Sequence, residues 1–273
     1  MIKLESSIVS VDWLNTNINS PDLIILDSSI EQVTNATDNV SEIQIPNTIF
    51  FDIKTKFSDV NSAFPNTVPS SELFSIEARK LGINHDSTIV VYDDKGIYSS
   101  ARVWWLFKAF GFDNIAVLDG GLPQWIASHY KTEIKQIRPI KEGNFNANYN
   151  PEYFKFFKDV IQLQNNTNCL ILDARSSSRF NGEIEEPRPG LRSGNIPNSK
   201  SLPYTELFNG FCLKPKNELE LIFKRLLNGE DNLVFTCGSG ITACILALVA
   251  EIIGLNNLSV YDGSWTEYGS LTT

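Results

Sequence analysis

The chain has 273 residues, of which 42% are hydrophobic and 11% aromatic, and it carries a formal net charge of −9 with a pI near 4.8. This size allows one large domain or two smaller ones, and the spread of acidic residues argues against nucleic acid as a partner, because phosphate neutralisation needs clustered Lys and Arg. Charged residues such as Lys3, Glu5 and Asp12 interrupt the start of the chain. We therefore expect no secretory signal and no contact with a membrane, and predict a soluble, cytoplasmic protein.

The elements expected along the chain occur in two similar series. In the first, a β-branched run at residues 89–93 leads through a loop into an apolar helix over residues 101–110. In the second, a run at residues 233–237 leads into a helix over about residues 242–253. Short apolar runs that alternate with helices predict an α/β fold, with an open sheet of parallel strands in each half.

The two series also end alike, which indicates a duplicated domain. Gly254 ends the second helix as Gly111 ends the first, 143 positions earlier. The polar stretch at residues 131–150 is typical of a linker. We therefore expect one domain at residues 1–140 and a second at residues 146–273.

Cys237 stands at the carboxyl end of the second run, where ligand sites lie in open parallel sheets. Gly238 and Gly240 let the backbone curl so that several N–H groups face one point, and the following helix N-terminus adds positive potential. Both effects favour the thiolate, the reactive form of cysteine. The hydroxyls of Ser239 and Thr242 can add hydrogen bonds to the sulfur, so we expect Cys237 to be a nucleophile with these two residues assisting it.

The remaining cysteines do not suggest chemistry. The position that matches Cys237 in the first half is Asp93, which cannot be a sulfur nucleophile, so we expect the second half to be catalytic and the first to be structural. Cys169, Cys212 and Cys244 are expected to be buried and inert. Without a C-x-x-C pair or a Cys/His cluster, we expect no disulfide framework, no metal and no cofactor.

The loop from Cys237 to Ala243 closely resembles the active-site loop of 3-mercaptopyruvate sulfurtransferases, which belong to the tandem-domain rhodanese family. The resemblance covers nearly the whole chain. Its other motifs are Phe50-Phe51-Asp52, Ser100-Ala101-Arg102-Val103-Trp104-Trp105, Asp119-Gly120-Gly121, Asp173-Ala174-Arg175, Glu186-Pro187-Arg188 and Tyr261-Asp262-Gly263-Ser264-Trp265. It implies two rhodanese-like domains, each an open, mostly parallel sheet flanked by helices, with sulfur passing from a donor to Cys237 as a persulfide and on to an acceptor.

The resemblance also bears on the sulfur donor. Thiosulfate-using relatives carry Arg and Lys directly after the cysteine, where this chain has Gly238 and Ser239. A neutral loop suits a monoanionic donor such as 3-mercaptopyruvate, whose carboxylate arginines can hold at a distance. The residues expected to bind the donor on this basis are Arg179, Arg188, Gly238, Gly240 and Ile241. Arg192 and Arg175 are further candidates.

Other side chains are expected to be structural. Arg175 is expected to pair with a nearby acid, and the acidic run at residues 183–186 is expected to be a solvated face. The tryptophans expected to pack in the core are Trp104, Trp105, Trp125 and Trp265.

One position departs from the family pattern. Some members carry a relay in which a histidine assists the loop serine, and Asn66 occupies the place of that histidine here. A proton relay through Ser239 is therefore not expected, and water can protonate the enolate that sulfur transfer leaves behind.

Three other functions remain open at this stage. Cysteine-dependent phosphatases and arsenate reductases also hold a thiolate between a strand and a helix, but they need an arginine where this chain has Ala243. A thiosulfate sulfurtransferase and a non-enzymatic persulfide relay both fit the same motifs. Small thiols, thioredoxin and cyanide are all compatible acceptors.

Overall fold

The computed structural model describes residues 2–32 and 40–272. The chain divides into two compact units. The segments of unit 1 are Met1–Asp59, Val68–Asn150 and Asn209–Leu213, and those of unit 2 are Val60–Thr67, Pro151–Phe208 and Lys214–Thr273. Each unit therefore includes a short segment from the other half of the sequence. Within the described residues, no helix is long and apolar enough to cross a membrane.

Unit 1 is built on a five-stranded sheet in the order β1-β6-β5-β2-β4, in which all neighbouring strands are parallel. Its strands are β1 (Ile8–Val9), β2 (Leu23–Asp27), β4 (Thr48–Phe50), β5 (Thr88–Tyr92) and β6 (Ile115–Leu118), and its helices are α1 (Val11–Asn17), α2 (Ser71–Lys80), α3 (Ser100–Ala109) and α4 (Gly121–Ala127). A small antiparallel pair joins β3 (Ile43–Gln44) to β7 (Glu133–Ile134). All five residues of β5 are buried, as expected for a parallel strand covered on both faces.

The two faces of this sheet carry different side chains. Val11 and Leu14 of α1 and Trp125 of α4 pack with Ile25 and Val90 on one face. On the other side, Phe74 of α2 and Phe107 of α3 pack with rings from neighbouring segments, which are Phe51, Phe57, Phe110 and Phe145. Because Phe145 belongs to this cluster, the expected linker at residues 131–150 packs along unit 1 rather than standing free of it.

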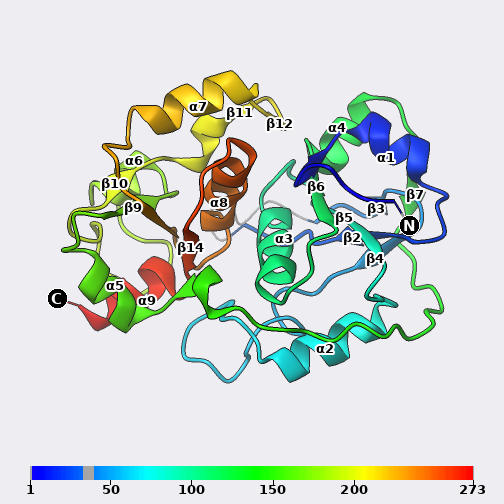
Figure 1. Ribbon diagram of the computed structural model, residues 1–273, viewed down its shortest axis with the longest axis horizontal. Coiled ribbons are helices and arrows are strands. Elements are labelled where there is room, and N and C mark those ends of the chain that lie inside the picture. The colour runs from blue at the N-terminus through cyan, green and yellow to red at the C-terminus, as the bar shows by residue number, and fades with distance from the viewer. Residues whose placement is uncertain (1, 33–39, 273) are drawn as a thin grey trace. The chain divides into compact units, whose positions relative to one another are not determined.

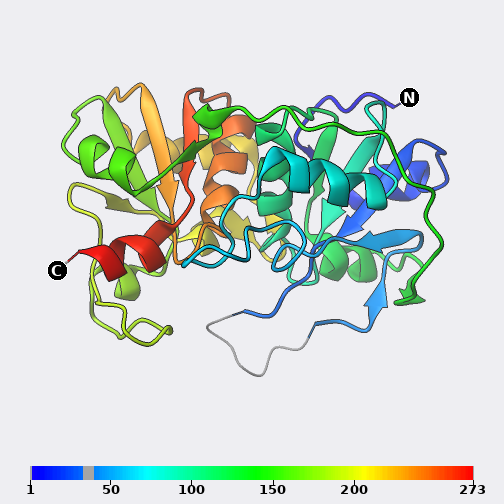
Figure 2. The same ribbon diagram turned by 90° about the horizontal axis from the view of Figure 1, so that it is seen from below.

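Unit 2 repeats this arrangement with the strand order β10-β9-β13-β14-β8, again parallel throughout. Its strands are β8 (Phe154–Lys155), β9 (Cys169–Asp173), β10 (Lys200–Ser201), β13 (Asn232–Thr236) and β14 (Leu258–Tyr261), and its helices are α5 (Phe157–Leu163), α6 (Ser177–Phe180), α7 (Lys216–Lys224), α8 (Ala243–Ile252) and α9 (Ser264–Leu271). Short 3-10 turns cover Pro151–Tyr153 and Tyr204–Leu207, and β11 (Phe208–Asn209) pairs with β12 (Cys212–Leu213). Figure 1 shows α8 beside β14, and Figure 2 shows β13 and β14 side by side in orange and red.

The core of unit 2 explains why this half folds as the first does. Val160 of α5 and Trp265 of α9 pack with Ile171 and Val234 of the central strands. Helix α8 is apolar except for Glu251 and is buried from Ala243 to Ala250. The predicted α/β class, with an open parallel sheet flanked by helices in each half, is confirmed.

The topology places one candidate site residue at the same point of the sheet in each unit. In both sheets the strand at the centre, β5 or β13, ends directly before the residue that we singled out, Asp93 or Cys237. Each loop then leads into a buried helix, α3 or α8. The carboxyl ends of central parallel strands are the usual location of ligand sites in such sheets.

Candidate active site

Cys237 is 2% exposed, and the first turn of α9 holds its backbone. The Cys237 N–H donates to Ser264 Oγ at 3.2 Å, and the Cys237 carbonyl accepts from the Trp265 N–H at 2.9 Å. The Gly238 carbonyl accepts from the Thr266 N–H at 2.9 Å and from the Thr266 hydroxyl at 2.5 Å. The position of Cys237 is thus fixed by several hydrogen bonds and not by the loop alone.

The rest of the loop turns directly into α8. Gly240 has φ +78°, a left-handed conformation that glycine adopts without a steric penalty. Its carbonyl accepts from Cys244 Sγ at 3.3 Å, and the Ile241 carbonyl accepts from the Cys244 N–H at 3.2 Å. Thr242 precedes the helix, and its side chain makes no capping hydrogen bond. The roles expected for Gly240, Ile241 and Thr242 in the reaction stay predictions.

Two of the predicted arginines flank the loop at Gly238. A Cβ atom built on Gly238 would lie 3.2 Å from Arg179 Nη2 and 3.7 Å from Arg188 Nη1. The absence of a side chain at this position therefore makes room for two guanidinium groups beside the residue that follows the cysteine. Arg179, Arg188 and Gly238 therefore lie together, and their role in binding a donor stays a prediction.

Ser239 is 8% exposed and accepts two hydrogen bonds. Arg188 Nη2 donates to Ser239 Oγ at 3.3 Å, and Asn66 Nδ2 donates to the same oxygen at 3.1 Å and to the Ser239 carbonyl at 3.2 Å. Because a carbonyl can only accept, the Asn66 amide nitrogen, and not its oxygen, faces Ser239. Both lone pairs of the hydroxyl are then engaged, so its own proton is left to donate, and neither of the two groups that donate to it can remove that proton.

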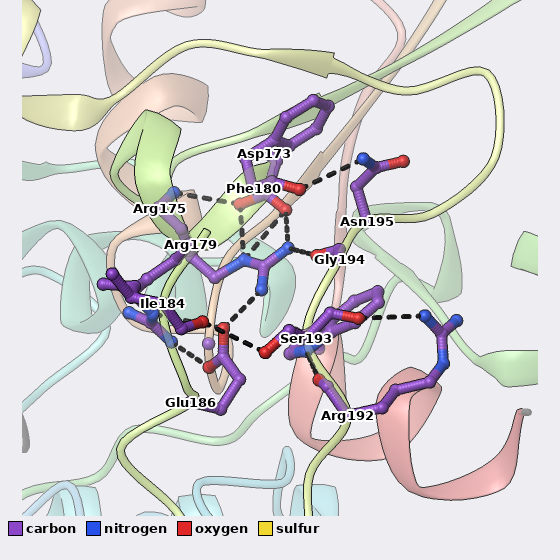
Figure 3. Close-up of polar contacts among 12 residues, drawn as sticks. Asp173, Arg175, Arg179, Phe180, Ile184, Glu186, Arg192, Ser193, Gly194 and Asn195 are labelled. Atoms are coloured by element: carbon purple, nitrogen blue, oxygen red, sulfur yellow. Dashed lines mark hydrogen bonds and ion pairs between the residues drawn. The ribbon is translucent and has the colours of Figure 1, made fainter. Parts of the chain in front are cut away.

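Arg179 belongs to a buried ion network (Figure 3). Arg175 Nη2 pairs with Asp173 Oδ2 at 2.7 Å, and Arg175 Nη1 pairs with Glu186 Oε1 at 2.7 Å. Arg179 pairs with the other oxygen of Glu186. Burial by itself would lower the pKa of Arg175, but Asp173 and Glu186 together raise it. The prediction that Arg175 pairs with a nearby acid is confirmed.

The expectation for the acidic run was wrong at Glu186. Its side chain is 1% exposed, because it bridges two guanidinium groups instead of facing water. A buried carboxylate between two arginines is stable since each charge has an opposite partner and hydrogen bonds. The network fixes Arg179 in the geometry that it adopts beside Gly238.

Arg192, one of the further candidates, is used elsewhere. Its Nη2 donates to Thr272 Oγ1 at 2.8 Å, and its guanidinium lies 4.6 Å from the ring centre of Trp265. The guanidinium of Arg175 lies 4.4 Å from the same ring centre. Trp265 and the other three tryptophans named above are buried, which confirms their expected place in the core.

Unit 1 has a carboxylate at the position that matches Cys237. Asp93 Oδ2 accepts from the amides of Tyr98, Ser99 and Ser100 at 2.7, 3.0 and 2.9 Å, and from the Ser100 hydroxyl at 2.7 Å. These donors stand where the loop enters α3. In this fold, therefore, the loop after the central strand can collect enough donors to hold an anion.

The other cysteines lie in less reactive settings. Cys244 is fully buried, whereas Cys169 and Cys212 are only partly buried, which corrects our expectation for those two. Burial nevertheless raises the pKa of the Cys169 thiol, and likewise that of Cys212, to about 11. Both are protonated near neutral pH and are poor nucleophiles there.

Comparison with known proteins places this geometry in a family. The model of the rhodanese-like domain matches residues 10–128 and 157–271. The chain is 36% identical over 267 residues to the 3-mercaptopyruvate sulfurtransferase of Escherichia coli K12, covering 96% of this chain and 94% of that protein. It is 36% identical over 294 residues to the Arabidopsis thaliana mitochondrial thiosulfate/3-mercaptopyruvate sulfurtransferase 1, covering 98% and 77%.

A solved structure agrees with these matches. The crystal structure of SseA from Escherichia coli, a 3-mercaptopyruvate sulfotransferase, superposes with a TM-score of 0.85 at 34% identity, covering 95% of this chain and 99% of that one. The fold, the two matched segments and the identity along the chain agree with one another. The chain belongs to the rhodanese-like domain family and carries two such domains in tandem.

Proposed function

We propose that this chain is a sulfurtransferase that takes sulfur from 3-mercaptopyruvate through a persulfide on Cys237. The observation that carries the proposal is the pair of arginines beside the cysteine loop: a Cβ atom on Gly238 would lie 3.2 Å from Arg179 Nη2 and 3.7 Å from Arg188 Nη1. The relatives in Escherichia coli and Arabidopsis thaliana are named for this donor, which supports the same assignment.

The arginines suit a donor that carries a carboxylate away from its reactive sulfur. Arg188 contacts Ser239 and Thr266 at 3.3 and 3.4 Å, and hydrogen bonds as long as these two are easily exchanged for bonds to a carboxylate. Arg179 is held by Glu186, so it is already oriented when the donor arrives. A guanidinium forms charge-assisted hydrogen bonds to carboxylates, which are about twice as strong as neutral ones.

In the reaction, the Cys237 thiolate attacks the sulfur of 3-mercaptopyruvate. A sulfur–sulfur bond forms, the carbon–sulfur bond breaks, and its electron pair leaves with the carbon as the enolate of pyruvate. The sulfur keeps its proton, so the product on the enzyme is a Cys237 persulfide. Protonation of the enolate then yields pyruvate.

Ser239 serves this reaction as a hydrogen-bond donor. Asn66 and Arg188 occupy both acceptor positions of its hydroxyl, so the hydroxyl proton is available to the bound sulfur or to the enolate oxygen. Asn66 cannot take up a proton as a histidine would. Water therefore supplies the proton that the enolate gains.

Unit 2 is proposed as the catalytic domain and unit 1 as the structural one, since Asp93 stands in place of a nucleophile in unit 1.

An external thiol completes the cycle when it attacks the outer sulfur of the persulfide and releases Cys237. Thioredoxin is one such thiol, and cyanide is another acceptor of the same sulfur. The cytoplasm is proposed as the compartment.

Steady-state kinetics of the purified protein test the proposal. We expect kcat/KM for 3-mercaptopyruvate to exceed that for thiosulfate, with cyanide or a dithiol as acceptor, and we expect Cys237→Ser to abolish both activities. Cys244→Ser is the matched control, because it removes a thiol from the neighbouring helix without touching the proposed nucleophile. Activity that survives in Cys237→Ser would sink the assignment.

A second variant tests the choice of donor. Gly238→Ala would place its methyl group 3.2 Å from Arg179 Nη2, closer than most Cβ contacts, while Glu186 holds that guanidinium in place. We expect a higher KM for 3-mercaptopyruvate, because the carboxylate grip is displaced, and a smaller change for thiosulfate. If both donors respond equally, thiosulfate becomes the better candidate.

A further inference from the structure

We propose that the first turn of α9 positions both the nucleophile and the arginine that binds the donor. Ser264 holds Cys237, and Thr266 joins Arg188 to the cysteine loop. This inference rests on the proposed function and adds two positioning residues to it. Neither side chain touches the donor in this account. Each acts through the residue that it holds.

The duplicated fold provides an internal comparison. In unit 2 the Trp265 N–H donates to the Cys237 carbonyl at 2.9 Å, and in unit 1 the Leu122 N–H donates to the Asp93 carbonyl at 3.0 Å. This bond is common to both halves and is therefore part of the fold. It does not distinguish the proposed catalytic loop from the structural one.

The residues on either side of this bond do differ between the halves. Counting from the shared bond, Ser264 corresponds to Gly121 and Thr266 corresponds to Pro123. Glycine has no hydroxyl and proline has no N–H, so unit 1 cannot form the bonds that Ser264 and Thr266 form in unit 2. The extra hydrogen bonds thus occur only around the loop that carries the cysteine.

Ser264 keeps its hydrogen bond at a conformational cost. Its φ is +50°, a region that residues other than glycine avoid, and the matching Gly121 has φ +52°. The side chain is fully buried, donates to the Tyr261 carbonyl at 2.8 Å and accepts from the Cys237 N–H at 3.2 Å. A strained buried residue that binds the amide of a nucleophile points to a role in function more than in stability.

Thr266 connects the donor grip to the loop. Its hydroxyl donates to the Gly238 carbonyl at 2.5 Å and accepts from Arg188 Nη1 at 3.4 Å. Because one oxygen serves both partners, Arg188 and the residue after Cys237 have a common support. Removal of this hydroxyl should loosen Arg188 without removing any charge.

The test compares Ser264→Gly, Thr266→Val, Thr266→Ser and the control Ser270→Ala, all on α9. Ser270 is exposed, and its hydroxyl donates at 2.6 Å to the backbone carbonyl of Thr266, so Ser270→Ala leaves the Thr266 hydroxyl in place. Three quantities are measured on each full-length variant: KM and kcat for 3-mercaptopyruvate, the rate of Cys237 alkylation by iodoacetamide between pH 6 and 9, and the thermal unfolding midpoint.

We expect Thr266→Val to raise KM roughly fivefold, the loss of one ordinary hydrogen bond, and Thr266→Ser to restore it. Ser264→Gly should lower kcat and change the pH profile of Cys237 alkylation. Its unfolding midpoint should change little, because the strain that glycine relieves at φ +50° offsets the loss of two buried hydrogen bonds. A merely structural serine would lower the midpoint and leave the alkylation profile unchanged.

Wild-type KM in Thr266→Val overturns the role of Thr266, and a wild-type alkylation profile in Ser264→Gly overturns that of Ser264. Equal losses in Ser270→Ala overturn both, since they would reflect the helix as a whole. Alkylation requires no sulfur donor. If Ser264→Gly changes the alkylation of Cys237 in a protein that has no activity with 3-mercaptopyruvate, the proposed function fails while the role of Ser264 stands.

Discussion

Replacement of Arg188 by glutamine tests the carboxylate grip. Two of the contacts that Arg188 makes, 3.4 Å to Thr266 Oγ1 and 3.3 Å to Ser239 Oγ, are at the long end for hydrogen bonds. A bound carboxylate would replace them with at least one charge-assisted bond, which contributes about 1.5–3 kcal/mol. Since each 1.4 kcal/mol is a factor of ten, the variant should raise KM for 3-mercaptopyruvate by roughly 10- to 150-fold.

Arg192→Gln is the matched control for this experiment. That arginine stacks on Trp265 and bonds to Thr272, so its loss should lower the unfolding midpoint and leave KM nearly unchanged. Initial rates of pyruvate release over a range of donor concentrations give both values, and a parallel series with thiosulfate should show a much smaller rise in KM for Arg188→Gln. Equal rises for the two donors, or equal rises in the two variants, would refute the carboxylate role.

Three further changes have defined outcomes. Asn66→His should add an ionisation near pH 6.5 to the pH profile of kcat/KM, with activity rising above that pH. The reason is that only a neutral histidine can take a proton from the Ser239 hydroxyl. An unaltered profile would argue against contact between the two side chains. Asp93→Ala should destabilise the chain by roughly 3 kcal/mol in urea unfolding, since it leaves buried donors unpaired, and Asp93→Asn should cost less. Because the pKa of each thiol is about 11, Cys169 and Cys212 should resist iodoacetamide at pH 7.5. Their labelling, followed by peptide mass mapping, should become about tenfold faster per pH unit up to that pKa. Fast labelling at pH 7.5 would contradict their burial.

Much of the fold could be predicted because the apolar patterns that mark its strands and helices are local and recur in the second half of the chain. The runs at residues 89–93 and 233–237 became the central strands β5 and β13, and the helices after them begin within two residues of the expected positions. The position of Cys237 at the end of a central strand follows from the strand order and the parallel pairing alone. The charge pattern could not reveal that Glu186 is buried, because burial depends on guanidinium groups that the fold brings to it.

The rest of the site depends on long-range contacts. Asn66 reaches Ser239 because Val60–Thr67 clusters with unit 2, although the two residues are 173 positions apart. The sequence resemblance drew attention to Asn66 but could not show which atom faces the serine. Ser264 and Thr266 were missed altogether. A comparison of the two halves at the same offset, serine against glycine and threonine against proline, was the signal that could have found them.

The central claim is that Cys237 carries the transferred sulfur. The most direct test treats the protein with 3-mercaptopyruvate in the absence of any acceptor and locates added mass by peptide mass spectrometry. We predict a gain of one sulfur atom on the peptide that contains Cys237, removed by cyanide or a dithiol and absent in Cys237→Ser. Added sulfur on Cys169, Cys212 or Cys244 instead, or the same gain in Cys237→Ser, would contradict the account.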